Sequence, residues 1–289
     1  MELTELTNKY RIIQQIASGQ NSRVYIGESP NNGIRVLKEL DITKLSPSED
    51  EMINSEINAM ENLSFYPNCN QHLVCFYESF KLRKDNRLYL YIVLEYIDGD
   101  NLSQITSVFP PDEMINIMLN LALGVKYIHD HGYAHRDIKP ENIILRKIDQ
   151  RPIIIDFGYT CQKCESGPGT LLYAPPEVLN NSISGLDAAK AHDVWSLGIT
   201  FYLLANRNFP FDIYQTGSYE DRGKIFTYTK NLPPKKIIGN IINCNLCPSN
   251  YSYGNQSIGL INEVIDSMLV CDWKNRPRID EVVKKLEGY

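Results

Sequence analysis

Two neighbouring stretches near the middle of the chain decide the fold. Residues 133–144 read Tyr-Ala-His-Arg-Asp-Ile-Lys-Pro-Glu-Asn-Ile-Ile, and residues 153–158 read Ile-Ile-Ile-Asp-Phe-Gly. The first stretch gathers acidic, basic and amide side chains, and the second is an apolar run that ends at an aspartate. A lone His-Arg-Asp triplet is a weak signal, so the meaning of both stretches depends on the sequence around them.

The chain before these stretches is mainly of β type. Between Tyr10 and Tyr96, short apolar runs are separated by turn residues such as Pro30-Asn-Asn-Gly33. These runs are RIIQQI, RVYIGES, IRVLKEL, HLVCFYESF and LYLYIVLEYI. One helix interrupts them, predicted over 47–63, because Ser46 is a good N-cap, Pro47 suits a first turn, and apolar residues then recur at helical spacing.

After Asp98-Gly-Asp100 the periodicity becomes helical. A helix is predicted from Asp112 to His131, and its apolar stripe consists of Met114, Ile117, Met118, Leu121, Val125 and Ile128. Further helical patterns cover 193–206, 261–269 and 279–288. The polar segment 212–257 supports no assignment.

Composition limits the classes of function. The chain has 289 residues, 43% of them hydrophobic and 22% charged, so it can bury one large core or two lobes. A net charge of −6 disfavours nucleic acid and anionic lipid as partners. No apolar run reaches membrane-spanning length and the first residues lack a signal-peptide core, so an intracellular protein, cytoplasmic or nuclear, is expected. Seven cysteines, an odd number, predict mostly reduced thiols.

In this order, the motifs resemble those of eukaryotic-type serine/threonine protein kinases. Upstream of the two central stretches stand Val36-Leu-Lys38 and Glu56, and downstream stand Pro-Pro-Glu at 175–177 and Asp-Val-Trp-Ser-Leu-Gly at 193–198. The resemblance runs from Tyr10 to about Leu286. It implies an α+β, two-lobed protein kinase fold that forms one kinase domain. The β-rich N-lobe with one main helix would be residues 1–97, and the mainly α C-lobe would be residues 98–289.

The resemblance also implies the catalytic roles. Asp137 would accept or orient the proton of the substrate hydroxyl, and Lys139 would offset charge on the transferring γ-phosphoryl group of ATP. Asn142 and Asp156 would supply oxygen ligands to Mg²⁺, for which Mn²⁺ can substitute. Thr170 is the fourth expected catalytic residue, beside Asp137, Lys139 and Asn142. Lys139 and Thr170 are features of serine/threonine kinases, so a protein serine or threonine is the expected acceptor.

The segment that would cover the ATP phosphates departs from the family pattern. Ala17 and Ser22 replace the first and third glycines of that pattern, Gly19 keeps the middle one, and Val24 follows. We expect weaker or stiffer closure over ATP, because the middle position needs the closest backbone approach. The expected nucleotide-binding residues are Ile16, Ala17, Ser18, Gly19, Gln20, Asn21, Ser22, Val24, Val36, Lys38, Glu56, Leu94, Glu95, Ile97, Ile144 and Asp156.

Several of these residues have more specific expected roles. Lys38 would contact the α- and β-phosphates and pair with Glu56, and Val36 stands where alanine is usual, which would narrow the adenine pocket. Leu94 matches the gatekeeper, and the residues from Glu95 to Ile97 match the hinge. Outside the nucleotide site, Glu177 is expected to pair with Arg276, and Asp193 is expected to anchor the backbone of the catalytic loop.

Two alternative functions stay open. The low glycine content of the phosphate loop would also suit a nucleotide-binding scaffold, or pseudokinase, that acts by contact. A dual-specificity kinase would phosphorylate tyrosine as well. Because the chain shows no docking domain, substrate choice would come from the cleft, from residues 212–257, or from an unseen activator or docking partner.

Regulation could involve phosphate or metal. Arg136 could pair with a phosphate on Ser166, the position closest to a usual activating site, or the kinase could be constitutively active. The two CxxC pairs, Cys161 with Cys164 and Cys244 with Cys247, fit a tetrahedral zinc site if they meet. Free thiols or a redox-sensitive pair are the alternatives.

Overall fold

The computed structural model describes residues 9–19, 21–31, 33–165, 169–180, 184–211, 234–246, 249, 251–253 and 256–288. The chain divides into two compact units. The first comprises Met1–Asp98 and Asp156–Gly158, and the second comprises Gly99–Ile155 and Tyr159–Tyr289. Each unit is described by itself.

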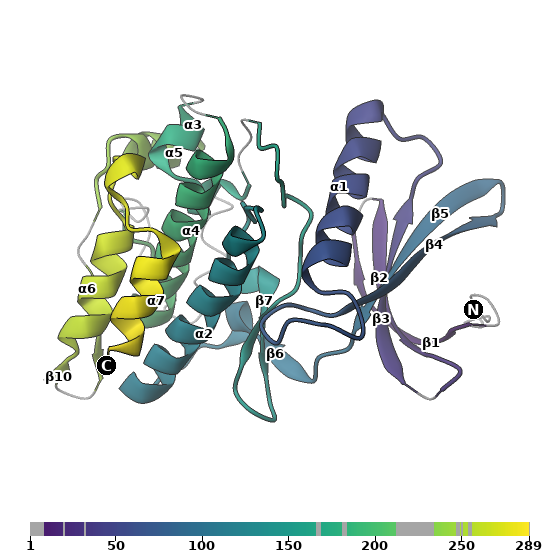
Figure 1. Ribbon diagram of the computed structural model, residues 1–289, viewed down its shortest axis with the longest axis horizontal. Coiled ribbons are helices and arrows are strands. Elements are labelled where there is room, and N and C mark those ends of the chain that lie inside the picture. The colour runs from purple at the N-terminus through teal and green to yellow at the C-terminus, as the bar shows by residue number, and fades with distance from the viewer. Residues whose placement is uncertain are drawn as a thin grey trace. The chain divides into compact units, whose positions relative to one another are not determined.

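The first unit is built on a five-stranded sheet with the order β1-β2-β3-β5-β4 (Figure 1). Its strands are β1 (Arg11–Ser18), β2 (Ser22–Glu28), β3 (Ile34–Asp41), β4 (Phe76–Lys84) and β5 (Arg87–Glu95). All neighbouring strands are antiparallel. On β3, Lys38 lies opposite Val24 of β2 and Ile92 of β5, and Leu37 faces the other side of the sheet because side chains alternate along a strand.

One helix, α1 (Pro47–Leu63), packs beside β4 in this unit. It begins where the sequence predicts, with a capping box in which the Ser46 side chain accepts from the Glu49 N–H and the Glu49 carboxylate accepts from the Ser46 N–H. Such a cap is worth about 0.5–2 kcal/mol of helix stability. The buried side of the helix includes Met60 and Leu63, and it also carries Glu56.

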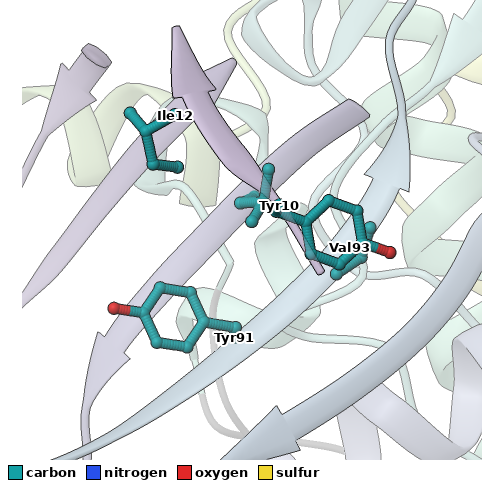
Figure 2. Close-up of a cluster of buried hydrophobic side chains, with 5 residues drawn as sticks. Tyr10, Ile12, Tyr91 and Val93 are labelled. Atoms are coloured by element: carbon teal, nitrogen blue, oxygen red, sulfur yellow. The ribbon is translucent and has the colours of Figure 1, made fainter. Parts of the chain in front are cut away.

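An aromatic core lies on the sheet in the first unit. Its buried members are Tyr10, Ile12, Leu37, Tyr91 and Val93, four of which are labelled in Figure 2. Phe80 lies between the rings of Tyr10 and Tyr91, with ring centroids 6.2 Å and 5.2 Å away. Full burial of one such side chain stabilises the fold by about 1.5–3 kcal/mol, so this cluster fixes the register of β3 and β5.

The second unit is mainly helical (Figure 1). Its helices are α2 (Pro111–Asp130), α3 (Pro176–Leu179), α4 (Leu186–Asn206), α5 (Pro234–Ile242), α6 (Gly259–Met268) and α7 (Ile279–Glu287). Its short strands are β6 (Gly99–Asn101), β7 (Ile143–Arg146), β8 (Pro152–Ile154), β9 (Ser252–Tyr253) and β10 (Gln256–Ser257). Helix α2 packs against α7 and α4, and α4 packs against α6. The six apolar residues that the sequence assigns to one stripe of α2 are all buried.

Helix α4 is buried on every side from His192 to Ala205. Its buried residues include the polar Asp193, Ser196 and Thr200, so no apolar stripe marks it in the sequence. The sequence pattern placed its start at Asp193, but the helix begins at Leu186. It ends at Asn206, and the C-cap residue Arg207 has φ 57° and donates its backbone N–H to the carbonyl of Leu203.

Strand β4 also differs from the sequence prediction, which began it at His72. In the structure β4 begins at Phe76. Leu73, Val74 and Cys75 are buried before the strand starts, so the apolar run there reports core packing and not strand pairing. Of the unassigned segment 212–257, the structure gives helix α5 and strands β9 and β10, and residues 212–233 lie outside the described residues.

The cysteines correct the expectation of mostly reduced thiols. The structure pairs Cys69 with Cys75, Cys161 with Cys164, and Cys244 with Cys271 as disulfides. Among the described residues, no helix is both long enough and apolar enough to cross a membrane.

Candidate active site

In the first unit, Lys38 is held between two carboxylates. Its Nζ lies 2.6 Å from Oε1 of Glu56 and 3.6 Å from Oδ1 of Asp156. The three residues come from β3, from α1 and from the segment after β8, so elements far apart in sequence build this group. The ion pair expected between Lys38 and Glu56 is therefore present.

The charges of this group are strongly coupled. Burial alone would lower the pKa of Lys38, but the carboxylates of Glu56 and Asp156 outweigh it and raise that pKa to about 12. Burial raises the pKa of Glu56, and Lys38 counters the effect only in part. Lys38 therefore stays a cation at neutral pH.

The loop between β1 and β2 contains the single glycine of the phosphate-loop motif. The Gly19 N–H donates to the carbonyl of Ser22 at 2.8 Å, which closes a tight turn. A Cβ at position 19 would lie 2.8 Å from the Ser22 Oγ, so a larger residue would displace that hydroxyl. Ile16, Ala17, Ser18, Gly19 and Asn21 are exposed and Ser22 is half-buried, while Gln20 lies outside the described residues.

The other expected nucleotide contacts of the first unit share one region of the sheet. Val36 lies opposite Ile26 on one side and Leu94 on the other. Leu94 and Ile97 are buried, and Val24 and Val36 are half-buried. Strand β5 ends at Glu95, so the backbone beyond Glu95 lies outside the sheet ladder. The Glu95 N–H donates to the Cys75 carbonyl at 2.8 Å. In the second unit, Ile144 lies on β7 opposite Asn101 and Ile153.

In the second unit, Asp137 is the centre of a dense hydrogen-bond network. Its Oδ1 accepts from the Thr170 N–H at 2.9 Å and from the Thr170 hydroxyl at 2.7 Å. Its Oδ2 accepts from Lys139 Nζ at 2.7 Å and from Asn142 Nδ2 at 2.9 Å. Lys139 Nζ also donates to the Thr170 hydroxyl at 2.6 Å. The four residues expected to be catalytic thus lie together.

This network sets the charge of Asp137. Burial would raise the pKa of its carboxyl, but hydrogen bonds from Lys139 and Thr170 outweigh burial and hold that pKa below the ordinary aspartate value. Asp137 is therefore a carboxylate throughout the neutral range. Its hydrogen bonds fix the orientation of both oxygens, as a proton-accepting or hydroxyl-orienting group requires.

Asp193 supports the backbone that carries Asp137. Its carboxylate accepts from the backbone N–H groups of His135 at 2.7 Å and of Arg136 at 2.6 Å. Arg136 has φ 63°, a conformation that costs a non-glycine residue energy and persists only where the surroundings impose it. Asp193 thus performs the anchoring role that the sequence assigned to it. Burial would raise its pKa, but a hydrogen bond with His129 outweighs burial and lowers it.

A glycine allows the segment with Thr170 to reach the Asp137 loop. A Cβ at Gly169 would lie 2.1 Å from the carbonyl oxygen of Arg136, a distance that no side chain can occupy. The close approach lets the next residue, Thr170, place both its N–H and its hydroxyl on Asp137. Any substitution at Gly169 would separate the two segments.

The expected pair of Glu177 with Arg276 is present and buried. Nη1 and Nη2 of Arg276 lie 2.5 Å and 2.7 Å from Oε1 and Oε2 of Glu177. The guanidinium carbon also lies 4.9 Å from the centroid of the Trp195 ring. This bidentate pair joins α3 to the segment before α7, 99 residues apart in sequence.

The donor chemistry of Asn142 and Asp156 suits Mg²⁺. Asn142 uses its amide nitrogen on the Asp137 carbonyl and carboxylate, both at 2.9 Å, so its oxygen is the atom suited to a metal. Asp156 is partly exposed and its Oδ1 also accepts from the Gly158 N–H at 3.2 Å. Amide and carboxylate oxygens are the ligands that Mg²⁺ prefers.

The zinc site expected from the two CxxC pairs is wrong for the described cysteines. Cys161 is bonded to Cys164, and Cys244 to Cys271, while Cys247 lies outside the described residues. A sulfur in a disulfide offers no thiolate to zinc. Within the part of the chain that the structure describes, no group of three or more His, Cys, Asp or Glu side chains could hold a metal ion.

Two features of the site were missed from the sequence. The guanidinium of Arg136 donates through Nε to the Tyr159 carbonyl and through Nη1 to the Glu165 carbonyl, each at 2.9 Å, where the sequence suggested a phosphate. Ser166 lies outside the described residues. His129, whose Nε2 lies 2.9 Å from Asp193, belongs to α2 and nothing in its helical pattern sets it apart.

Comparison with known proteins agrees with this geometry. The model of the protein kinase domain family matches residues 10–286. Serine/threonine-protein kinase Nek5 of Homo sapiens is 30% identical over 217 residues, which are 71% of this chain and 29% of that protein. Maternal embryonic leucine zipper kinase of Xenopus tropicalis is 32% identical over 222 residues, 72% of this chain and 31% of that protein.

A third relative matches over more of the chain. Putative serine/threonine-protein kinase A of Trypanosoma brucei brucei is 26% identical over 284 residues, which are 92% of this chain and 58% of that protein. The chain thus spans about a third or less of Nek5 and of the leucine zipper kinase, and somewhat over half of the trypanosome protein. With the family model matched over nearly all of its length, the chain belongs to the eukaryotic-type serine/threonine protein kinase family.

Proposed function

We propose that the chain is an active serine/threonine protein kinase that transfers the γ-phosphoryl group of ATP to a hydroxyl of a protein substrate. The observation that carries this proposal is the network around Asp137, in which a buried carboxylate with a lowered pKa is oriented by Lys139, Asn142 and Thr170. Phosphoryl transfer depends mainly on positioning and on charge stabilisation, and this network serves both.

Each residue of the network has a distinct role. Asp137 orients the acceptor hydroxyl and accepts its proton. Lys139 donates to both Asp137 and Thr170, and its proposed role is to offset the negative charge that develops on the transferring group. Thr170 belongs to residues 156–177, which we call the activation segment. Its hydrogen bonds to Asp137 link the placement of this segment to the orientation of the carboxylate.

The first unit supplies the proposed contacts to ATP. Lys38 pairs with the phosphates, and Glu56 and Asp156 keep it charged and in place. Gly19 allows the loop backbone to approach the phosphates, while Val36 and Leu94 shape the adenine pocket. Mg²⁺, bound by Asn142 and Asp156, would neutralise charge on the phosphate oxygens.

An assay of phosphate transfer tests the proposal. Mg²⁺ and labelled ATP are supplied with a generic protein substrate, and the native chain is compared with Asp137→Asn. We expect the variant to lose about 10³-fold in kcat, since a positioned proton acceptor contributes roughly 10²–10⁴-fold. Acid hydrolysis of the product is expected to yield phosphoserine and phosphothreonine, and phosphotyrosine as well would indicate dual specificity.

Binding measurements separate catalysis from a scaffold function. ATP binding is followed by thermal shift in both proteins, and Asp137→Asn should bind as the native chain does. Binding without transfer in the native chain, under every condition of metal and substrate, would contradict the proposal and favour the pseudokinase. Equal transfer by the two proteins would show that Asp137 has another role.

A further inference from the structure

The side chain of Arg136 binds both ends of residues 159–165, which follow Asp-Phe-Gly. Arg136 donates to the carbonyl of Tyr159 and to the carbonyl of Glu165, each at 2.9 Å. One planar guanidinium thus bridges two points of the chain six residues apart. This is the arginine that the family resemblance assigns to a phosphate, and two of its donor nitrogens bind backbone carbonyls of residues 159–165.

Cys161 and Cys164 lie between these two points. Cys161 forms a β-bridge with Ala134, in which both N–H···O distances are 2.9 Å. The carbonyl of Cys164 accepts from the Gly185 N–H at 2.9 Å, at the start of α4. The segment is therefore attached through the two cysteine residues to Ala134, two residues before Arg136, and to Gly185, the N-cap of α4.

The two sulfurs are bonded within a small apolar cluster. Cys161 and Cys164 are buried with Ala134 and Ala189, and Leu186 packs against them. Their Cα atoms are 5.4 Å apart, within the range that a disulfide spans without backbone movement. The bond closes the turn between the two carbonyls that Arg136 bridges, so it restricts the spacing on which that bridge depends.

We propose that Cys161 and Cys164 form a reversible redox modification site, whose disulfide holds the activation segment in its active arrangement in place of a loop phosphate. The proposal rests on the kinase function proposed above. The oxidised form is the more active, because the closed turn keeps Tyr159 and Glu165 on Arg136, the residue next to Asp137. When the disulfide is reduced, residues 159–165 have more conformational freedom, so a larger entropy cost opposes the active arrangement of the segment.

The chemistry balances with a peroxide as oxidant. One cysteine thiolate attacks a peroxide oxygen, the O–O bond breaks, and a sulfenic acid and one water form after protonation. The second thiol attacks that sulfur, the S–S bond forms and a second water leaves. Two thiols and one hydrogen peroxide thus give one disulfide and two waters, and a dithiol reverses the step.

The test compares reduced and oxidised protein. The full chain is reduced with a phosphine or oxidised with hydrogen peroxide, the reagent is removed, and peptide mapping by mass spectrometry confirms the state of the two cysteines. We expect kcat to be about tenfold higher in the oxidised form, which corresponds to about 1.4 kcal/mol, while KM for ATP changes little.

Two variants assign the effect. Cys161→Ala/Cys164→Ala keeps the cluster apolar, and it should have the low rate of the reduced form and no response to peroxide. Cys69→Ala/Cys75→Ala removes a disulfide of the first unit and should keep the full response. A response that survives in the first variant, or equal rates for oxidised and reduced native chain, would overturn the proposal.

A measurement that needs no activity separates this proposal from the kinase function. Hydrogen exchange of the backbone amides between Tyr159 and Glu165 should be slower in the oxidised native chain than in the reduced chain. Equal exchange would overturn the redox proposal even in an active enzyme. Slower exchange together with absent phosphate transfer in both states would support the role of the disulfide in holding the segment and would contradict the proposed kinase function.

Discussion

Two buried ion pairs, one in each unit, hold a cation in different ways. Arg276 of the second unit has no exposed side-chain surface, whereas 24% of the Lys38 side chain in the first unit is exposed. A guanidinium has five N–H donors, and those of Arg276 reach the Glu177 oxygens and the carbonyls of Val270, Ala191 and Cys271.

Lys38 has three N–H donors, and Glu56 and Asp156 are the two partners that the described residues give it. One donor therefore remains for a ligand. The difference teaches that a cation whose donors are all used by the protein holds the fold, whereas a cation with a donor to spare can serve a substrate. Removal of the first should cost stability, and removal of the second should cost activity.

The largest expected effect is on the structural pair. Arg276→Met should lower the free energy of unfolding by about 3–5 kcal/mol, because it leaves the Glu177 carboxylate buried and unpaired. Urea denaturation followed by circular dichroism measures this loss. Arg278→Met is the matched control, since its side chain is 86% exposed and pairs only with Asp280 among the described residues. Similar losses in the two variants would refute the structural role of Arg276.

The next effect concerns the functional pair. Lys38→Met should lower kcat/KM for ATP by about 10²–10³-fold, the usual result of removing one group that stabilises transition-state charge. The free energy of unfolding should fall less than in Arg276→Met, because Lys38 is partly exposed and Glu56 can take up a proton. Steady-state kinetics and urea denaturation give the two numbers. Lys81→Met, on the exposed face of β4, is the control.

The smallest effect is a shift in pH dependence. Thr170→Val removes one hydroxyl donor from Asp137, while its backbone N–H stays. We expect kcat to fall about tenfold. Because Asp137 must be ionised and its pKa is lowered, activity is retained below the ordinary aspartate range and lost as pH falls through the lowered pKa.

The variant should lose activity at higher pH than the native chain. With one hydrogen bond fewer to counter burial, the pKa of Asp137 should be higher in the variant than in the native chain. The acid limb of kcat/KM should therefore move up by about one pH unit, the equivalent of one hydrogen bond. Thr170→Ser keeps a hydroxyl and should leave the limb in place. An unchanged limb in Thr170→Val would mean that the Thr170 hydroxyl does not help to set the charge of Asp137.

Local sequence rules predicted the parts of the fold that depend on local chemistry. Ser46, Pro47 and Glu49 mark the start of α1 because a capping box needs only four consecutive residues. The apolar stripe of α2 was visible because one of its faces is solvated. The early turns of α4 were missed because they contain Asp187 and Lys190 and few large apolar residues, so the helical pattern becomes visible only from Asp193 on.

The candidate site was predicted where ordered motifs carry it, and not where distant residues meet. Lys38, Glu56 and Asp137 were found through motif order, and their ion pairs and hydrogen bonds are present. The spacing of two CxxC pairs suggested zinc, but spacing does not tell which sulfur a cysteine will meet. Cys244 is bonded to Cys271, 27 residues further on, a partner that no local pattern indicates.

The long separation of Glu177 and Arg276 has a consequence for synthesis. A ribosome adds about 5–20 residues per second, so the 99 residues between them take about 5–20 s to appear. Throughout that interval the Glu177 carboxylate lacks the guanidinium of Arg276. Helix α4 likewise remains uncovered until the residues of α6 have been added. The nascent second unit therefore exposes for seconds the apolar surface that α6 later covers.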